Sequence, residues 1–284
     1  MRQLIIVADM EGASGIFESN REACYHEEIY TKKTLWRDFG RGCITSDVLA
    51  VCEAANNFGI DEIMLYDGHF AGCDEFNVML DKLPRNVRVF DVPNRESHWR
   101  RIRGQALLNP FGIITVGQHA RFGEPNAYFP HTVQTPPIKA FWVNELNIGE
   151  IGIGVLSFRG VPYIANIGCA ASHKEALELS SKVGCISVKD KLHKWEPSCI
   201  ETSPLIREGV FSALKDYDKK TAAEMNGYCK CSMELDDKYH FDIPKHITWR
   251  GEFHKKAAYW EAPYFEIALE LFEVVRGYIC KDNS

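Results

Sequence analysis

An unbroken apolar run at residues 4–8 leads directly into two acidic residues, Asp9 and Glu11. Such a run is typical of a strand that is buried on both faces, as in the parallel sheet of an α/β fold. Residues two apart at a strand end point to the same face, so both carboxylates should converge at the carboxyl edge of the sheet. Open α/β sheets place their ligands at this edge. Like charges this close repel, so one carboxylate must hold a proton unless a cation lies between them.

Strand-like and helix-like segments alternate along the first two-thirds of the chain. A helix should begin near Thr45 and end at Gly59, and two more are expected at residues 149–158 and 172–182. The predicted strands are residues 4–8, 63–66, 87–92, 112–116, 140–143, 163–167 and 186–188. This alternation predicts an α/β fold, with a largely parallel sheet and helices on both faces.

The pattern changes after about residue 194. We expect a helix at residues 206–216, a strand at 229–235 that pairs with 257–260, and a terminal helix at 265–279. The sequence therefore predicts a metal-binding α/β catalytic domain at 1–194 and a smaller α+β portion at 195–284. No obvious linker separates them, so this boundary is soft.

The formal charge of −6 gives the chain no basic surface for nucleic acid or for an anionic membrane. No apolar run approaches the roughly 18 residues of a membrane helix, and Arg2 precedes a short strand rather than a signal peptide's apolar segment. We therefore expect a cytoplasmic protein whose ten cysteines are reduced and pack as small apolar side chains. Cys229 and Cys231 could chelate as a pair, but no second pair completes a zinc site.

Polar side chains follow two further predicted strands. His69 comes after the strand at 63–66, and His119 after the strand at 112–116. Glu150 lies in an apolar, glycine-rich setting, where a carboxylate is costly without a partner. Three strands thus deliver carboxylate and imidazole groups to one sheet edge, which predicts a metal centre. The alternative is a set of capped turns, with Asp9 and Asp67 as N-caps.

The loop at residues 123–132 follows His119 closely and contains His131. Pro125 and Pro130 stiffen it, and loops of this kind often carry catalytic groups over a rigid scaffold. A neutral imidazole can act as a base or a nucleophile. We expect His131 to be an exposed loop side chain that faces the cleft.

Five separated motifs resemble those of the D-aminopeptidase family of dinuclear zinc peptidases. Their order and spacing fit across about residues 1–190, and they lie at residues 9–15, 67–69, 117–121, 130–132 and 143–152. The resemblance implies two zinc ions per subunit. It assigns Asp9 as the ligand that bridges them, Glu11 and His119 as the other ligands of one ion, and His69 and Glu150 as those of the second.

The resemblance also implies that His131 is the catalytic histidine, and that the subunits form a ring-like homo-oligomer acting on short peptides. Two departures from the family pattern leave the implied ligands intact. The family has an acidic pair after the strand at 163–167, where this chain has Gly168-Cys169-Ala170, and residues 70–109 lack the family pattern. The preference for D- or L-residues is therefore left open.

The first hypothesis is a cytoplasmic dinuclear zinc aminopeptidase that removes the N-terminal residue, a D-amino acid by the resemblance, from short peptides. The second is a metal-dependent hydrolase of another small amide or a phosphoester. A phosphoester would need a cation near the metals, for which Arg121 is the candidate. The third is a non-catalytic, metal-stabilised oligomer, which would need the ligands but not His131.

Overall fold

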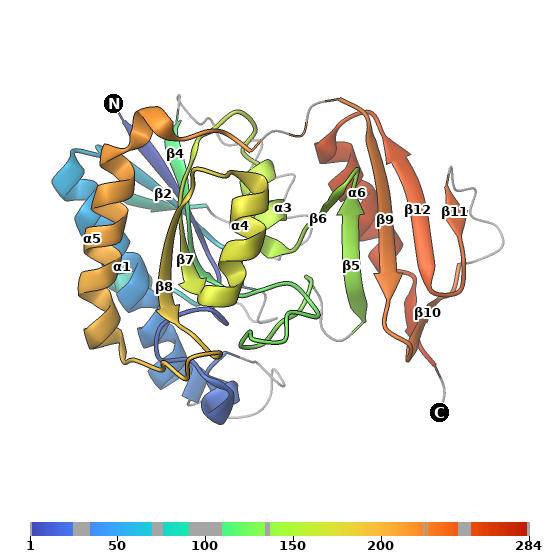
Figure 1. The fold of residues 1–284 in the computed structure, drawn as a ribbon, viewed down its shortest axis with the longest axis horizontal. Coiled ribbons are helices and arrows are strands. Elements are labelled where there is room, and N and C mark those ends of the chain that lie inside the picture. Colours follow the sequence, from blue (N-terminus) through green and yellow to red (C-terminus); the bar gives the residue numbers. More distant parts are fainter. Residues whose placement is uncertain are drawn as a thin grey trace.

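The computed structural model describes residues 2–24, 35–69, 76–90, 110–133, 137–223, 225, 227–243 and 251–282. A sheet of six parallel strands, in the spatial order β3-β2-β1-β4-β7-β8, forms the larger part of the molecule (Figure 1). These strands are β1 (Gln3–Ala8), β2 (Glu62–Asp67), β3 (Val87–Val89), β4 (Pro110–Gln118), β7 (Tyr163–Cys169) and β8 (Gly184–Lys189).

The strand order reverses between β1 and β4. The chain adds β2 and β3 on one side of β1, and then adds β4, β7 and β8 on the other side. At such a switch point the connections leave in opposite directions, and a crevice opens beyond the carboxyl ends of the two strands. This crevice is where a doubly wound sheet binds its ligands.

Helices cover both faces of this sheet (Figure 1). On one face lie α1 (Arg41–Phe58) and α5 (Cys199–Lys215), and on the other lie α3 (Glu150–Leu156) and α4 (His173–Leu179). The alternate β1 residues Leu4 and Ile6 pack in the α1 and α5 core, whereas Ile5 and Val7 pack in the core that contains α3. Burial on both faces explains the unbroken apolar run, and the predicted α/β fold is confirmed.

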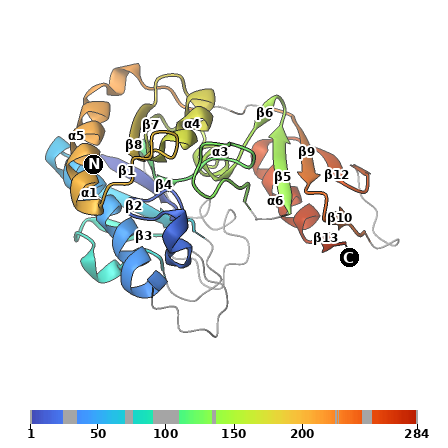
Figure 2. The ribbon, with the colours of Figure 1, turned by 60° about the horizontal axis from the view of Figure 1, so that its bottom comes forward.

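A second, antiparallel sheet has the order β11-β12-β9-β5-β6. Its strands are β5 (Ile138–Val143), β6 (Leu146–Asn147), β9 (Cys229–Leu235), β11 (Glu252–Phe253) and β12 (Ala257–Ala262). The terminal helix α6 (Phe265–Arg276) packs on it, and β10 (Tyr239–Phe241) pairs with β13 (Ile279–Lys281). One apolar cluster contains Val7 of β1, Ile151 of α3 and Phe272 of α6, so α3 lies between the two sheets (Figure 2).

The short helical turns of the described residues are η1 (Glu18–Ala23), η2 (Trp36–Gly40), η3 (Leu80–Lys82), η4 (Ala170–Ser172) and η5 (Tyr217–Lys219). The π-helical turn η2 runs directly into α1, which therefore starts at Arg41 and not near Thr45. Two polar residues of the first turns of α1 hold neighbouring loops. Thr45 Oγ1 accepts the Met79 N–H, and Asp47 Oδ2 accepts the Ser14 N–H.

Other boundaries differ from the prediction as well. Helix α5 begins at Cys199, ahead of residue 206, because Ser198 and Glu201 form a capping box there. Helix α6 ends at Arg276, which frees the following residues to form β13. The predicted strand at 87–92 is described only to residue 90, and its last two residues lie outside the described ranges.

Elements cross the predicted boundary near residue 194 in both directions. Strand β5 precedes it but pairs with β9 in the antiparallel sheet, whereas α5 follows it but packs on α1 and β8. A short apolar segment looks the same in a parallel and an antiparallel sheet, so the sequence could not assign β5. The division at residue 194 stays a prediction. No helix in the described ranges is long and apolar enough to cross a membrane.

Candidate metal centre

Three neighbouring strands of the parallel sheet end at one level. Ala8, the last residue of β1, pairs with Asp67 of β2 on one side and with Val116 of β4 on the other. Asp9 therefore emerges between the ends of β2 and β4, at the switch point of the sheet. His69 and His119 each follow one of these flanking strands within two residues.

Two glycines let the segments after β1 and β4 meet backbone to backbone. The Gly12 N–H donates to the Gly117 carbonyl at 2.8 Å. A Cβ on Gly12 would lie 1.8 Å from the Gln118 oxygen, and one on Gly117, whose φ is +71°, would lie 2.1 Å from the Asp9 oxygen. No other residue type fits at either position. This close approach brings the Glu11 segment up against the end of β4.

The five predicted ligands come together in this crevice. His119 Nε2 lies 3.3 Å from Asp9 Oδ2 and 3.6 Å from Glu150 Oε1. His69 Nε2 lies 3.1 Å from Glu11 Oε1. Glu150 is the first residue of α3, and its Oε1 lies 3.6 Å from Nε2 of both His119 and His131. The structure therefore places all five side chains in one cluster.

Burial makes this cluster unusual. The relative exposure of Asp9, Glu11, His69 and His119 lies between 2% and 7%. Three of their buried atoms have no hydrogen-bond partner, namely Asp9 Oδ2, Glu11 Oε2 and His119 Nε2. Such atoms are costly to bury without a partner, and all three are lone-pair donors of the kind that bind a cation. The residues present therefore fit a metal site.

His131 is buried, with 7% exposure, and it is not the exposed loop side chain that we expected. Its ring stacks on that of His119, with centroids 3.9 Å apart and planes within 7° of parallel. It does face the cluster, because its Nε2 lies 3.6 Å from Glu150 Oε1 and 3.9 Å from Glu11 Oε1. The aromatic residues Tyr128 and Phe129 of the same loop are also buried and pull the loop inward.

All three imidazoles turn Nε2 towards the carboxylates. Nδ1 of His119 donates to the Ala120 carbonyl at 2.9 Å, and Nδ1 of His131 donates to the Phe129 carbonyl at 2.8 Å. A carbonyl oxygen only accepts, so Nδ1 carries a proton, and in the neutral form of either ring the lone pair is on Nε2. Outer contacts of this kind orient the histidines of metal sites.

His69 is oriented by the side chain of Asn77, which no sequence motif marks. Its Nδ1 lies 3.0 Å from Asn77 Oδ1, which also accepts the Trp36 indole N–H at 3.1 Å. Because the indole can only donate, this Asn77 atom is the oxygen, and His69 carries its proton on Nδ1. Asp67 in turn accepts the Asn77 backbone N–H at 2.6 Å and its side-chain N–H at 2.9 Å. Asp67 is therefore a support for His69 rather than a helix cap.

The ionisable groups create a field that attracts cations. Burial and the neighbouring Glu11 raise the pKa of Asp9 well above its usual value. Burial opposes a charge on Glu11, but the facing His69 and His131 outweigh it and hold the Glu11 pKa well below its usual value. Burial disfavours a charge on His69 too, yet Glu11 outweighs it and raises the His69 pKa to about 9. Protons are thus held on Asp9 and His69, while Glu11 keeps its negative charge.

His119 and His131 respond differently to the same surroundings. Burial disfavours a charge on His119, but Glu150 and Asp9 outweigh it and raise the His119 pKa well above its usual value. Burial, and then the charge of His119, lower the pKa of His131. Burial opposes a charge on Glu150, and His119 and His131 outweigh it and lower the Glu150 pKa.

Among the residues that the structure describes, two groups of three have ligand atoms that all lie within 4.8 Å of one another. One group is Asp9, Glu11 and His119, which matches the first site implied by the resemblance. The other is His119, His131 and Glu150. His69 lies beside Glu11 and is not grouped with Glu150. The assignment of individual ligands to two ions stays a prediction.

A sequence model of the D-aminopeptidase family of peptidases matches residues 1–274. The chain belongs to the D-aminopeptidase family. The match extends the resemblance past residue 190 into the antiparallel sheet. A solved structure, the Zn-dependent D-aminopeptidase DppA from Bacillus subtilis, "a self-compartmentalizing protease", shares this fold with a TM-score of 0.76 and 19% identity over 97% of each chain. No curated protein matched the sequence.

In this member of the D-aminopeptidase family, the start of α3 is held by a buried carboxylate from α4. Glu175 Oε1 accepts the N–H groups of Gly149 at 2.7 Å and Gly152 at 2.8 Å, on either side of Glu150. Burial raises the pKa of Glu175 to about 7, although Arg121 and these N–H groups oppose the rise. This contact could not be predicted from the sequence, because a glutamate in a helical segment is usually a solvated residue.

The Arg121 guanidinium is paired with polar groups close to the start of α3. Its Nη1 donates to the Asn147 carbonyl and lies 2.8 Å from Glu178 Oε2, and its Nε lies 3.8 Å from Glu175 Oε2. Its exposure is 7%. The guanidinium therefore links the segment after His119 to the start of α3, and it is not presented as an open anion site.

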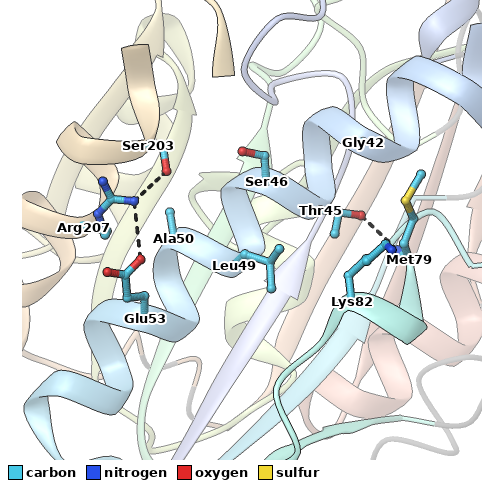
Figure 3. A pocket seen from close by; sticks show the side chains of 10 residues that line it. All are labelled: Gly42, Thr45, Ser46, Leu49, Ala50, Glu53, Met79, Lys82, Ser203 and Arg207. Carbon is cyan, nitrogen blue, oxygen red and sulfur yellow. Dashed lines mark hydrogen bonds and ion pairs between the residues drawn. The ribbon is translucent and has the colours of Figure 1, made fainter. Parts of the chain in front are cut away.

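A separate groove lies on the outer side of α1, away from the cluster (Figure 3). Several of its polar groups already have partners in the protein. Arg207 Nη1 contacts Ser203 Oγ at 3.0 Å and Glu53 Oε2 at 3.4 Å, and Thr45 holds the Met79 N–H. The groove is lined by Gly42, Thr45, Ser46, Leu49, Ala50, Glu53, Met79, Lys82, Ser203 and Arg207. None of the six predicted site residues lies among them.

Proposed function

We propose that this D-aminopeptidase family member is a zinc-dependent aminopeptidase that removes the N-terminal residue, a D-amino acid by family membership, from short peptides. One observation carries the proposal. Buried carboxylate and imidazole atoms converge at the switch point of the sheet, and three of them have no hydrogen-bond partner. A cation satisfies all of these atoms at once, and carboxylates with neutral imidazoles suit zinc.

Asp9, Glu11, His69, His119 and Glu150 would hold the metal, and we propose two ions bridged by Asp9. When bound, zinc lowers the pKa of a coordinated water to about 7 and polarises a scissile carbonyl. The three carboxylates offset the charge of the ions. The neutral imidazoles present Nε2, since Nδ1 is occupied by a fixed acceptor in His69, His119 and His131.

We propose that His131 is the catalytic histidine. Its Nε2 lone pair faces the crevice beside Glu150 and Glu11, because its Nδ1 proton is held by the Phe129 carbonyl. From this position Nε2 can take a proton during attack on the peptide and return it to the leaving amine. Stacking on His119 fixes the ring plane, so little reorientation is needed.

The phosphoester and structural-metal hypotheses lose support from contacts in the structure. A phosphoester hydrolase would need an open cation, but Arg121 is engaged by Glu175, Glu178 and the Asn147 carbonyl. A purely structural metal site would need no sixth polar side chain. His131 nevertheless turns its lone pair into the buried crevice, a placement that costs free energy unless the group is used.

We further propose that the protein acts in the cytoplasm as a ring-like homo-oligomer. Nine cysteines of the described residues are free thiols, in keeping with a reducing compartment. The Bacillus subtilis protein with this fold is self-compartmentalizing, and a similar assembly here would limit access to short peptides.

The decisive experiment combines metal analysis of the purified protein with a screen of paired D- and L-aminoacyl peptides. We expect two equivalents of zinc, hydrolysis that stops on chelation and returns with zinc, and faster turnover of the D-residue. A protein that binds no metal at this cluster, or that cleaves phosphoesters but no peptide, would disprove the proposal. Faster removal of the L-residue would change only the stereochemical preference in the proposal.

A further inference from the structure

Lys189 is the last residue of β8, and its side chain is completely buried, with 0% exposure. Its ammonium group donates to three backbone carbonyls, those of Glu11 at 2.6 Å, Ala13 at 3.0 Å and Ile16 at 2.5 Å. An ammonium group has three N–H donors, so each one has an acceptor. All three acceptors belong to the turn that follows β1, and this turn is folded around a single cation.

The same ammonium group is surrounded by three aromatic rings. It lies 5.7 Å from the ring centre of Phe17, at the end of the turn, and 5.3 and 5.9 Å from those of Tyr128 and Phe129. Cation–π attraction at these distances is favourable in a buried site. Phe129 is two residues before His131, and its carbonyl accepts the His131 Nδ1–H. Lys189 therefore joins the turn that carries Glu11 to the loop that carries His131.

An apolar side chain could fill the space between the three rings, but it would lose the cation–π attraction and would leave three carbonyls of the turn without donors. The hydrogen bonds to the turn are therefore the contacts that only a donor can make. The Glu11 carbonyl is one of the three acceptors, so the direction of the Glu11 backbone, and with it the carboxylate, depends on Lys189. No ligand-forming side chain of the cluster makes a hydrogen bond to Lys189 in the described residues, so its effect is indirect.

We propose that Lys189 is a positioning residue that sets Glu11 and His131 at their places around the metal. The inference rests on the metal site proposed above. Supports of metal ligands typically contribute about 10–100-fold to metal affinity or activity. Loss of Lys189 should therefore weaken zinc binding by about 10–100-fold. It should also change the geometry at the metal, because Glu11 loses its fixed direction.

The test uses Lys189→Met, which keeps the length of the side chain but has no donor, and Lys189→Gln, which keeps two N–H donors on a shorter chain. Zinc affinity is measured by competition with a chelator, and the visible spectrum of the cobalt-substituted protein reports the coordination geometry. Both are measured on protein that circular dichroism shows to be folded. We expect weaker zinc binding and a shifted cobalt spectrum in Lys189→Met, and a smaller effect in Lys189→Gln.

The matched control is Val188→Ala, which creates a cavity at the preceding, fully buried position of β8. It should lower the melting temperature but leave zinc affinity and the cobalt spectrum unchanged. If Lys189→Met only melts earlier, as the control does, and binds zinc as tightly with the same spectrum, the inference is wrong. Should Lys189→Met fail to fold, the Lys189→Gln result decides. Failure of the wild type to bind zinc would instead disprove the proposed function.

Discussion

His119 and His131 stack face to face, with ring centres 3.9 Å apart, although twelve positions separate them in the sequence. One ring belongs to the strand end that supplies an implied metal ligand, and the other to the loop above it. Each ring buries a face of the other, so neither can be removed without an effect on its partner. A substitution that tests the catalytic role of His131 therefore also changes the stability of the site.

We predict that His131→Ala lowers turnover by about 10²–10⁴-fold, the usual contribution of a general base. Because the ring is buried against His119, its loss should also cost about 0.5–3 kcal/mol of unfolding free energy. Peptide hydrolysis per folded molecule, measured beside a melting curve, separates the two effects. The exposed His193 provides the control, since His193→Ala should change neither quantity. Full activity per folded molecule in His131→Ala would remove His131 from the mechanism.

Asp9→Asn should release more metal than the matching amide replacement of any other ligand. Asp9 Oδ2 lies 3.3 Å from His119 Nε2 and has no hydrogen-bond partner, and a bridging carboxylate would serve both ions. The comparison is with Glu150→Gln, whose side chain is 25% exposed and would serve one ion. Zinc per subunit is measured after dialysis against a weak chelator. Two equivalents retained by Asp9→Asn as tightly as by wild type would refute the bridging assignment.

Much of the fold and the cluster could be predicted because both depend on local patterns. The run at residues 4–8 is apolar throughout because Ile5 and Ile6 face different cores, and polar residues mark the point where the strand leaves the sheet. The rule that polar residues follow a buried strand also predicted the positions of His69 and His119. Parallel strands end at one edge, so these side chains had to meet.

The supports of the cluster could not be predicted, because they depend on distant contacts. Lys189 reaches Glu11 across 178 positions, and Glu175 reaches Gly149 across 26. Nothing in the neighbouring sequence distinguishes either residue from a solvated charge. The burial of His131 was also missed, because a polar, proline-bounded loop usually lies on the surface.

Glu175→Ala should weaken the metal site without touching a ligand. It leaves the buried N–H groups of Gly149 and Gly152 without an acceptor, which costs about 1–3 kcal/mol each, and it loosens Glu150 between them. Zinc affinity should fall by about 10–100-fold. Glu175→Gln keeps one acceptor oxygen and should lie between this variant and wild type.

Glu178→Ala is the control for the Glu175 variants. Glu178 also contacts Arg121, but its side chain is 40% exposed, and its ion pair is with Arg121 rather than with the start of α3, so its loss should cost less than about 1 kcal/mol. Chelator competition and thermal melting are run on all three variants. Zinc affinity in Glu175→Ala equal to that in Glu178→Ala would show that Glu175 does not position Glu150.

His173 should make the fold sensitive to acid, apart from any effect of the metal. Its Nδ1 accepts the Asn166 side-chain N–H at 2.8 Å, and its Nε2–H donates to Ser187 Oγ at 3.0 Å. A proton on Nδ1 would face the Asn166 N–H, so that two donors would meet without an acceptor. Burial lowers the His173 pKa to about 4. Between about pH 6.5 and 4 the unfolded chain binds a proton that the folded chain does not, so stability falls as the pH falls.

The difference in unfolding free energy between wild type and His173→Gln isolates this contribution. This difference should be constant above about pH 6.5. As the pH falls towards about 4, wild type should lose up to about 3 kcal/mol of unfolding free energy relative to the variant, and below about pH 4 the difference should level off. Denaturant unfolding at a series of pH values, with metal removed from both proteins, measures it. A wild-type to His173→Gln difference that is flat from pH 7 to pH 4 would mean that His173 stays neutral in the unfolded chain or is protonated in the folded one.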